Sequence, residues 1–267
     1  MRSDIDATRF SVVLSRALCC KYLAVFFDCL CMQTCAGDVP EKCMLWALGV
    51  HDGGERELLG VWLAVDPASL PWREAFADLK MRGVESMRFV IGTGPEGMVG
   101  DLLRESFGAM TLPSIGSALA ASLAQAAPRN REAVARGLRS VVEANSWGSA
   151  GEALRAAARS QEGVKYPQIV AQWRVVLIQC EPLFRMPAPR RRMVLSGDCL
   201  AQRLHVAVAR SMGRQSDFAI PTEALDFVAG ALLRAERLFD RQRVVEVARA
   251  SVRGVGTVSG TAAQAFV

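Results

Sequence analysis

The chain has 267 residues, of which 51% are hydrophobic and 22% charged, and it carries a net charge of +5. This balance suits a soluble globular protein with one large core or two smaller ones. It argues against a membrane protein, because charges interrupt every apolar run of about 18 residues; the closest run, "CCKYLAVFFDCLC", contains Lys21 and Asp28. The first ten residues lack the apolar segment of a signal peptide, so we expect a cytoplasmic location.

Three apolar segments near the start are rich in β-forming residues and predict three strands. They are "YLAVFFDCLC" (22–31), "CMLWALGV" (43–50) and "RELLGVWLAV" (56–65). The segment "HDGGE" joins the last two, and its Asp-Gly-Gly is typical of a tight hairpin turn. We therefore expect an antiparallel meander at the start of the sheet.

A helix, a strand, a second helix and a short strand are predicted next. The first helix is expected over 69–83, with Ser69 as its N-cap, Pro71 in its first turn and Gly83 at its end. The later elements are expected at 84–92, Met98–Phe107 and 108–113. The whole order is β-β-β-α-β-α-β, in which a right-handed crossover follows the meander.

Six of the eight cysteines lie between Cys19 and Cys43. On the predicted first strand, Cys29 and Cys31 share one face and Asp28 lies on the other, because side chains alternate along a strand. The cysteine spacings match no common zinc motif, and the sequence has no paired C-x-x-C motifs. We expect reduced thiols buried in the core rather than a metal site.

From Ser114 to about Gln179 the sequence is rich in alanine and has a helical period, with no strand candidate. After "MPAPRRRMVLSGD", amphipathic helices are predicted over Cys199–Met212, Pro221 to about Asp240, and Arg241–Val252. We expect an α/β (α+β) fold whose parts are an N-terminal lead (1–21), a first part of the core (22–113), an all-helical insertion (114–185), a basic helical part of the core (186–253) and a flexible tail (254–267).

Basic residues are concentrated toward the C-terminus. Residues 186–267 contain 12 arginines and 7 acidic residues, an excess equal to the whole net charge of +5. The densest point is the run from Arg190 to Arg192. A patch of this kind attracts phosphates, although a short charge run is more often a solvated face. The residues alone leave both interpretations open.

The stretch "FVIGTGPEGMVG" (89–100) contains a G-x-G-x-x-G formed by Gly92, Gly94 and Gly97. In a dinucleotide site this motif follows the first strand, and an acid about 20 residues later binds the ribose. Here three predicted strands precede the motif, and no acid occupies the later position. The sequence therefore argues against a dinucleotide site.

The block "LGVHDGGERELLGVWLAVDPASLPWREAFADLKMRGVESMRFVIGTGPEGM" resembles the catalytic core of Mutator-like bacterial transposases. The family pattern runs "GV…DG.RE.LG" and then "WREFL..LKARGL.GV.LVISDAHEGL". The residues that fall on it are Gly49, Val50, Asp52, Gly53, Arg56, Glu57, Leu59, Gly60, Trp72, Arg73, Leu79, Lys80, Arg82, Gly83, Val90, Ile91, Glu96 and Gly97. The likeness resumes at "FRMPAPRRRMVLSGDCLAQRL" and "DFAIPTEALDFVAGALL", so it covers most of the chain from Tyr22 to about Asp240.

This resemblance implies an RNase H-like core and the chemistry of DNA strand cleavage and transfer. In such DDE-type transposases three carboxylates hold two divalent metal ions, Mg²⁺ or Mn²⁺. The ions activate water or a 3′-hydroxyl and stabilise the leaving oxygen. The implied partner is DNA, together with a second copy of the chain or an active transposase. No membrane partner is expected.

Only one of the three acids stands at its expected position. Asp28 corresponds to the first acid, whereas Thr93 replaces the second and Ala201 the third (Gln202 if the alignment shifts by one). One carboxylate cannot hold two metal ions. Asp28 is therefore either a surviving metal ligand or a carboxylate left at the edge of the core.

Two other acids are candidate substitutes. Glu96 and Asp198 each lie three residues from a lost acid, an offset that keeps a similar helix face. Their simpler roles are, respectively, a helix-start charge and the N-cap of a helix that begins at Cys199. The Cys-x-x-His of the family falls on Ser114 and Ser117.

The resemblance thus predicts a truncated transposase-family protein that is impaired in catalysis. The alternative is a non-catalytic DNA-binding or regulatory protein that keeps the fold. The first strand begins near Tyr22, which leaves little room for the N-terminal DNA-binding region of the family. No partner pattern around His51 or His205 supports a hydrolase triad. The expected phosphate contacts are Arg190, Arg191, Arg192, Arg203 and Arg210.

Overall fold

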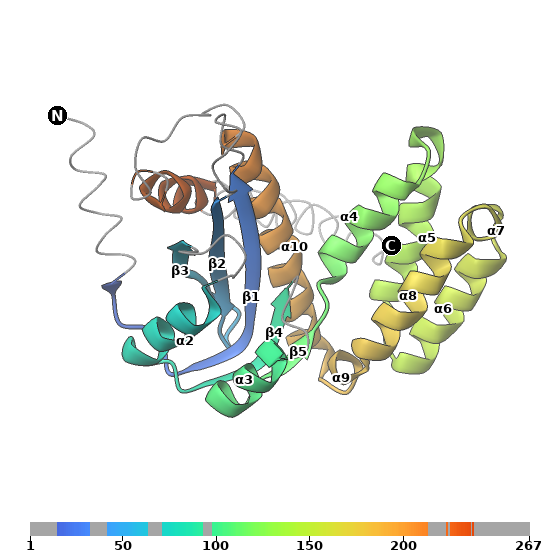
Figure 1. Cartoon of the computed structure of the whole chain (residues 1–267). Coiled ribbons are helices and arrows are strands. Elements are labelled where there is room, and N and C mark those ends of the chain that lie inside the picture. Colours follow the sequence, from blue (N-terminus) through green and yellow to red (C-terminus); the bar gives the residue numbers. More distant parts are fainter. Residues whose placement is uncertain are drawn as a thin grey trace, which may run out of the picture.

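A computed structural model describes residues 15–32, 42–63, 71–92, 98–212, 223, 225–235 and 237. Its centre is a five-stranded mixed sheet in the order β3-β2-β1-β4-β5 (Figure 1). The strands are β1 (Lys21–Met32), β2 (Lys42–Val50), β3 (Arg56–Leu63), β4 (Ser86–Gly92) and β5 (Met110–Leu112). All five strands lie within or overlap the predicted segments.

The sheet combines an antiparallel meander with two parallel pairs. β1 pairs antiparallel with β2, and β2 with β3, whereas β4 runs parallel to both β1 and β5. The parallel connections carry the helices α2 (Trp72–Met81) and α3 (Met98–Phe107). The predicted order β-β-β-α-β-α-β is therefore confirmed, and the central strand is β1.

Two glycine turns explain the bounds of these elements. Between β2 and β3, the amide of His51 donates to the carbonyl of Glu55 (2.9 Å), and Gly54 has a φ of 91° that favours glycine. Gly83, with a φ of 104°, follows the end of α2 as predicted. Pro71 immediately precedes α2 instead of lying inside its first turn, and Ser69 lies outside the described residues.

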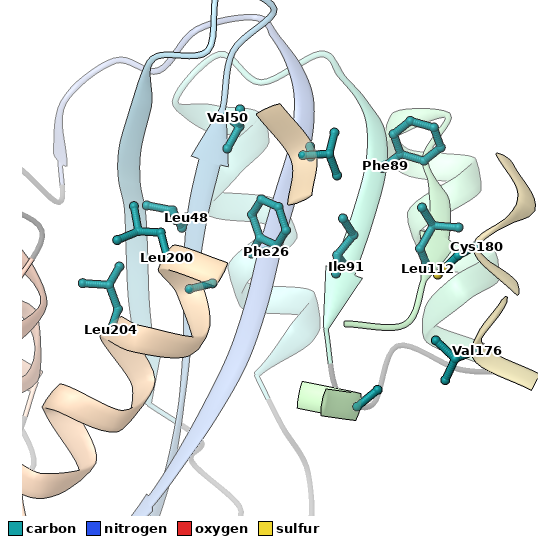
Figure 2. Packing of buried hydrophobic residues seen from close by; sticks show 14 of the residues in the cluster. Phe26, Leu48, Val50, Phe89, Ile91, Leu112, Val176, Cys180, Leu200 and Leu204 are labelled. Atoms are coloured by element: carbon teal, nitrogen blue, oxygen red, sulfur yellow. The ribbon is translucent and has the colours of Figure 1, made fainter. Parts of the chain in front are cut away.

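Each face of the sheet is covered by its own layer of helices. Phe27 and its neighbours on one face pack against α2 and α3. On the other face, Phe26 and Leu48 lie opposite Leu200 and Leu204 of helix α10 (Figure 2). The helical residues 225–235 add buried apolar side chains to this second cluster. The alternation of neighbouring residues such as Phe26 and Phe27 follows from the two-residue period of a strand.

The chain between β5 and α10 is entirely helical, and it lies beside the sheet on the side of β5 (Figure 1). This part comprises α4 (Ile115–Gln125), a 3₁₀ turn (Pro128–Asn130), α5 (Arg131–Val142), α6 (Trp147–Arg159), α7 (Gln161–Lys165), α8 (Pro167–Gln179) and α9 (Glu181–Phe184). The absence of strands here agrees with the sequence. None of the helices within the described residues has the length and hydropathy needed to span a membrane.

The last labelled helix, α10 (Ala188–Met212), begins well before the predicted start at Cys199. The prolines and Gly197 of this segment are nevertheless compatible with a helix. Pro189 lies in the first turn, where a missing N–H costs nothing. Gly197 is required by packing, because a Cβ there would lie 2.7 Å from Cε2 of Phe26.

The cysteines only partly match the expectation of buried, reduced thiols. Cys19 and Cys20 are exposed thiols, because they precede the point at which β1 enters the sheet. Cys29 is a half-buried thiol, and Cys43 is disulfide-bonded. The prediction is therefore wrong in burial for Cys19 and Cys20, and wrong in redox state for Cys43.

Candidate functional site

The site is centred on Asp28, which lies in the middle strand β1 on the face covered by α10. Its side chain is 18% exposed, and its cross-strand neighbour is the buried Trp46 of β2. One carboxylate oxygen, Oδ1, accepts a hydrogen bond from the backbone amide of Cys29 (2.8 Å). The other, Oδ2, faces α10.

The residue of α10 that meets Asp28 is His205. Its Nδ1 lies 2.9 Å from Oδ2 of Asp28. Contact with this carboxylate raises the pKa of His205, and the opposing effect of burial is smaller. The sequence around His205 does not indicate this partner, because Asp28 lies far away along the chain. The position of His205 seven residues after Asp198 was the available signal, because that spacing returns to the same helix face.

The second acid of the site, Asp198, is buried in the middle of α10 with 5% exposure. Its carboxylate accepts hydrogen bonds from the hydroxyl of Ser114 (2.7 Å) and the backbone amide of Gly116 (2.6 Å). Burial raises the pKa of Asp198, its hydrogen-bond donors oppose that effect, and the charge of Asp28 raises it further. Asp198 is not the helix N-cap that the sequence predicts, because α10 begins at Ala188, about three turns earlier.

The donors to Asp198 belong to the first turn of α4. Ser114 caps this helix by accepting a hydrogen bond from the amide of Ser117 (3.0 Å), and Ser117 donates its own hydroxyl to Gln202 of α10 (3.0 Å). The two helices approach closely at Gly116, where an added Cβ would lie 3.3 Å from Cβ of Gln202. The positive end of the α4 dipole therefore faces the Asp198 carboxylate.

The positions of the two lost acids differ in what the structure describes. Ala201 is buried in the core on α10, between Asp198 and His205 along the helix, and it offers no ligand atom. Thr93 and Glu96 lie outside the described residues. Gly92 ends β4 next to Phe27, and an added Cβ would collide with the carbonyl oxygen of Phe27. Close packing against Phe27 therefore explains why the first position of the G-x-G-x-x-G is a glycine.

Within the described part of the chain, the donor set of this site does not fit two divalent ions. Among the described residues, no group of three or more His, Cys, Asp or Glu side chains could hold a metal. Protein groups already contact both oxygens of Asp28 and both oxygens of Asp198. Burial, together with the charge of Asp28, raises the pKa of Cys29 to about 11, so this neighbour is a neutral thiol at pH 7.

The five arginines expected to contact phosphates have different surroundings. Arg192, Arg203 and Arg210 are exposed on α10. Arg190 lies 3.7 Å from Asp52 of the β2–β3 turn. Arg191 is buried: it donates to the carbonyls of Ala144 and Asn145 and lies over the ring of Phe184. Arg191 therefore has a role inside the fold that the charge run did not indicate.

A second polar cluster lies around Glu57, one of the residues that carry the resemblance. Its carboxylate accepts a hydrogen bond from the hydroxyl of Tyr22 (2.6 Å) and contacts Arg16 (2.6 Å) and His51 (2.8 Å). Burial and Glu57 raise the pKa of Tyr22, so its hydroxyl stays protonated. This cluster ties the segment before β1 to the β2–β3 hairpin, and it gives Glu57 a structural role.

Comparison with known proteins gives a consistent picture. The sequence profile described as "Transposase, Mutator family" matches residues 9–234. The chain is 27% identical over 205 residues to a "Probable transposase for insertion sequence element" of Corynebacterium diphtheriae. The aligned region covers 76% of this chain and 60% of that protein. It is 25% identical over 198 residues to the "Transposase for insertion sequence element ISRM3" of Rhizobium meliloti. That aligned region covers 74% of this chain and 49% of the relative.

The chain thus spans about half to three-fifths of the length of the curated relatives it matches. The profile match nevertheless extends over most of the chain, from before β1 to the helical residues 225–235. The expected resemblance is confirmed by this match. The chain belongs to the Mutator family of transposases.

Proposed function

We propose that this chain is a DNA-transposition protein with an RNase H-like core, that it contacts DNA, and that it is impaired in strand cleavage and transfer. The order β3-β2-β1-β4-β5, with an antiparallel meander followed by parallel strands, supports such a core. We include α10 in this core and treat residues 114–185 as a helical insertion into it. The observation that carries the impairment is the engagement of Asp28 and Asp198 with protein groups.

The bound metal ions of a DDE-type transposase activate the attacking oxygen and stabilise the leaving one. Mg²⁺ requires near-octahedral oxygen ligands at about 2.0–2.1 Å. At this site the carboxylate of Asp28 is directed at His205, Asp198 is turned into the first turn of α4, and Ala201 presents a methyl group. The described residues therefore position two carboxylates without leaving either one open toward a shared ion.

The proposed DNA contact rests on α10. Arg192, Arg203 and Arg210 are spaced 11 and 7 residues apart, which returns to one side of a helix. The three side chains are exposed and span about 27 Å along the helix axis at 1.5 Å per residue. A row of arginines over this distance is suited to the phosphates of a DNA strand, because such contacts are electrostatic and independent of sequence.

DNA retention as a function of salt tests the contact. Binding of labelled duplex DNA is measured over a salt series for the wild type and for Arg192→Gln/Arg203→Gln/Arg210→Gln. Each lost phosphate contact removes about 0.9 from the slope of log affinity against log salt, so we expect a slope that is smaller by about 2–3. The matched control is Arg73→Gln/Lys80→Gln/Arg104→Gln, which removes the same charge from exposed positions of α2 and α3.

Nicking of supercoiled DNA with Mg²⁺ or Mn²⁺ tests the impairment. We expect the wild type to nick no faster than Asp28→Asn. Metal-dependent nicking by the wild type that disappears in Asp28→Asn would overturn the impairment. If the α10 variant and its control show the same slope of log affinity against log salt, the proposal that α10 contacts DNA would be overturned.

A further inference from the structure

Protein groups contact both acids of the site: His205 lies against Asp28, and the Ser114 hydroxyl and Gly116 amide donate hydrogen bonds to Asp198. From this geometry we propose that His205 is an internal replacement for a divalent cation at Asp28 and closes that carboxylate to metal ions. The inference rests on the proposed function, because it explains how a transposase fold keeps an acidic site without the metal ions of its relatives. It assigns to His205 a role that the resemblance alone does not predict.

The first step is the contact itself. With Nδ1 of His205 only 2.9 Å from Oδ2 of Asp28, a cation bound to Oδ2 would have to displace the imidazole ring. The ring thus occupies the approach to Oδ2, and Mg²⁺ prefers oxygen ligands to a ring nitrogen. The ring and a hard cation therefore compete for the same carboxylate oxygen.

The second step is that the backbone that carries the imidazole is held in place. His205 follows Leu204 and precedes Val208 on α10, and both of these neighbours are fully buried against the sheet. Gly197 brings α10 so close to β1 that an added Cβ would lie 2.7 Å from Cε2 of Phe26. Because the helix backbone is fixed by this packing, His205 cannot withdraw from Asp28 without a rotamer change on the side chain itself.

The third step concerns the other acid. Asp198 is engaged separately, because it accepts hydrogen bonds from the amide of Gly116 and the hydroxyl of Ser114 at the start of α4. Helix N-termini stabilise anions in this way. The two carboxylates are close enough for the charge of Asp28 to influence Asp198, yet each is contacted by different protein groups. No shared cation is needed to hold them in the same site.

Mn²⁺ binding to the purified full chain, followed by electron paramagnetic resonance of the unbound ion, tests this proposal without reference to activity. We expect wild type and Asp28→Asn to bind Mn²⁺ equally weakly. In His205→Asp, where two carboxylates would face each other, we expect binding at least about tenfold tighter, since clustered carboxylate oxygens are the ligands that Mn²⁺ favours. This gain is expected to vanish in Asp28→Asn/His205→Asp.

Binding by the wild type that Asp28→Asn weakens by about tenfold would overturn the proposal, because it would show that His205 leaves Asp28 open to the ion. A folded His205→Asp that binds no better than the wild type would overturn it as well. Circular dichroism monitors folding of each variant. If His205→Asp does not fold, the comparison of wild type with Asp28→Asn still decides. Mn²⁺ binding does not depend on DNA retention by the α10 arginines. A failure of the His205 proposal can therefore be distinguished from a failure of the proposed DNA contact.

Discussion

Nδ1 of His205 lies 2.9 Å from Oδ2 of Asp28, so an acid in the central strand and a base on α10 are in direct contact across the core layer. The pKa of His205 is raised above its ordinary value of 6.5, chiefly by this contact. Because the folded-state pKa exceeds the unfolded one, the contact stabilises the fold fully below pH 6.5. That contribution is lost as the pH rises through the raised value.

Urea unfolding over a pH series checks this expectation. The difference in free energy of unfolding between wild type and His205→Asn should be largest at pH 6 and below and should shrink at alkaline pH, about 8 and above. The same decline should be absent when Asp28→Asn is compared with Asp28→Asn/His205→Asn, because the partner charge is gone. A difference that is constant over the series, or that grows with pH, would contradict the pairing.

The buried carboxylate of Asp198 should be important for stability. In Asp198→Ala, the amide of Gly116 and the hydroxyl of Ser114 lose their acceptor at a buried position. We expect a loss of about 1–3 kcal/mol in the free energy of unfolding at neutral pH. The matched control is Asp101→Ala on α3, an acid whose side chain is 69% exposed and for which we expect less than about 0.5 kcal/mol.

Equal losses for Asp198→Ala and Asp101→Ala in urea or thermal unfolding would mean that the contact between α4 and α10 does not depend on this carboxylate. Ser114→Ala provides an intermediate case, because it removes one donor to Asp198 and also the cap of α4. Its cost should fall between those of the two aspartate variants.

Two glycines in helix interiors should respond to alanine in opposite ways. At Gly197 of α10, a Cβ would lie 2.7 Å from Cε2 of Phe26 and 2.8 Å from Cγ2 of Val50. We expect Gly197→Ala to cost about 1–3 kcal/mol through overpacking. At Gly137 of α5, a Cβ would meet Cβ of Ala157 at 3.5 Å, an ordinary contact. Gly137→Ala should stabilise the protein by about 0.5–1 kcal/mol through helix propensity.

Thermal unfolding of the two glycine variants gives a direct comparison, since the substitution and the helical context are the same. The sign of the change should differ between them. A destabilised Gly137→Ala together with an unchanged Gly197→Ala would show that α10 does not pack on β1 as closely as described.

The strands could be predicted from the sequence because their signal is local. The alternation of Phe26 and Phe27 between the two faces follows from the strand period, and the turn at Gly54 follows from residues that tolerate positive φ. Such elements can be placed without knowing which residues contact them from distant parts of the sequence. The same holds for the helices between β5 and α10, whose apolar period is strong.

The site could be predicted only in part, because its contacts join residues that are far apart in the sequence. Asp28 is identified through the resemblance, but no local pattern in the sequence joins it to His205, which lies far along the chain on α10. Proline and glycine usually favour loops. Pro189 is compatible with α10 because it lies in the first turn, and Gly197 is compatible because the helix packs closely on Phe26 at that point. With that helix shortened, Asp198 looked like a cap instead of a buried residue.

Two buried tryptophans differ in one hydrogen bond and therefore offer a last test of the core. Nε1 of Trp173 donates to the hydroxyl of Ser122 (2.9 Å). Nε1 of Trp46 is buried without an acceptor among the described residues, next to Asp28 in the cross-strand register. Tryptophan-to-phenylalanine substitution removes similar apolar area at both positions. It also removes a satisfied N–H at Trp173 and an unsatisfied one at Trp46.

An unpaired buried donor is costly, so its removal offsets part of the packing loss. We expect Trp173→Phe to lower the free energy of unfolding by about 1–2 kcal/mol more than Trp46→Phe does. Urea unfolding measures both, and adding Ser122→Ala to Trp173→Phe checks whether the excess arises from the hydroxyl partner. If Trp46→Phe proves the more costly variant, its indole N–H has an acceptor, and the nearby carboxylate of Asp28 would then be the first group to test.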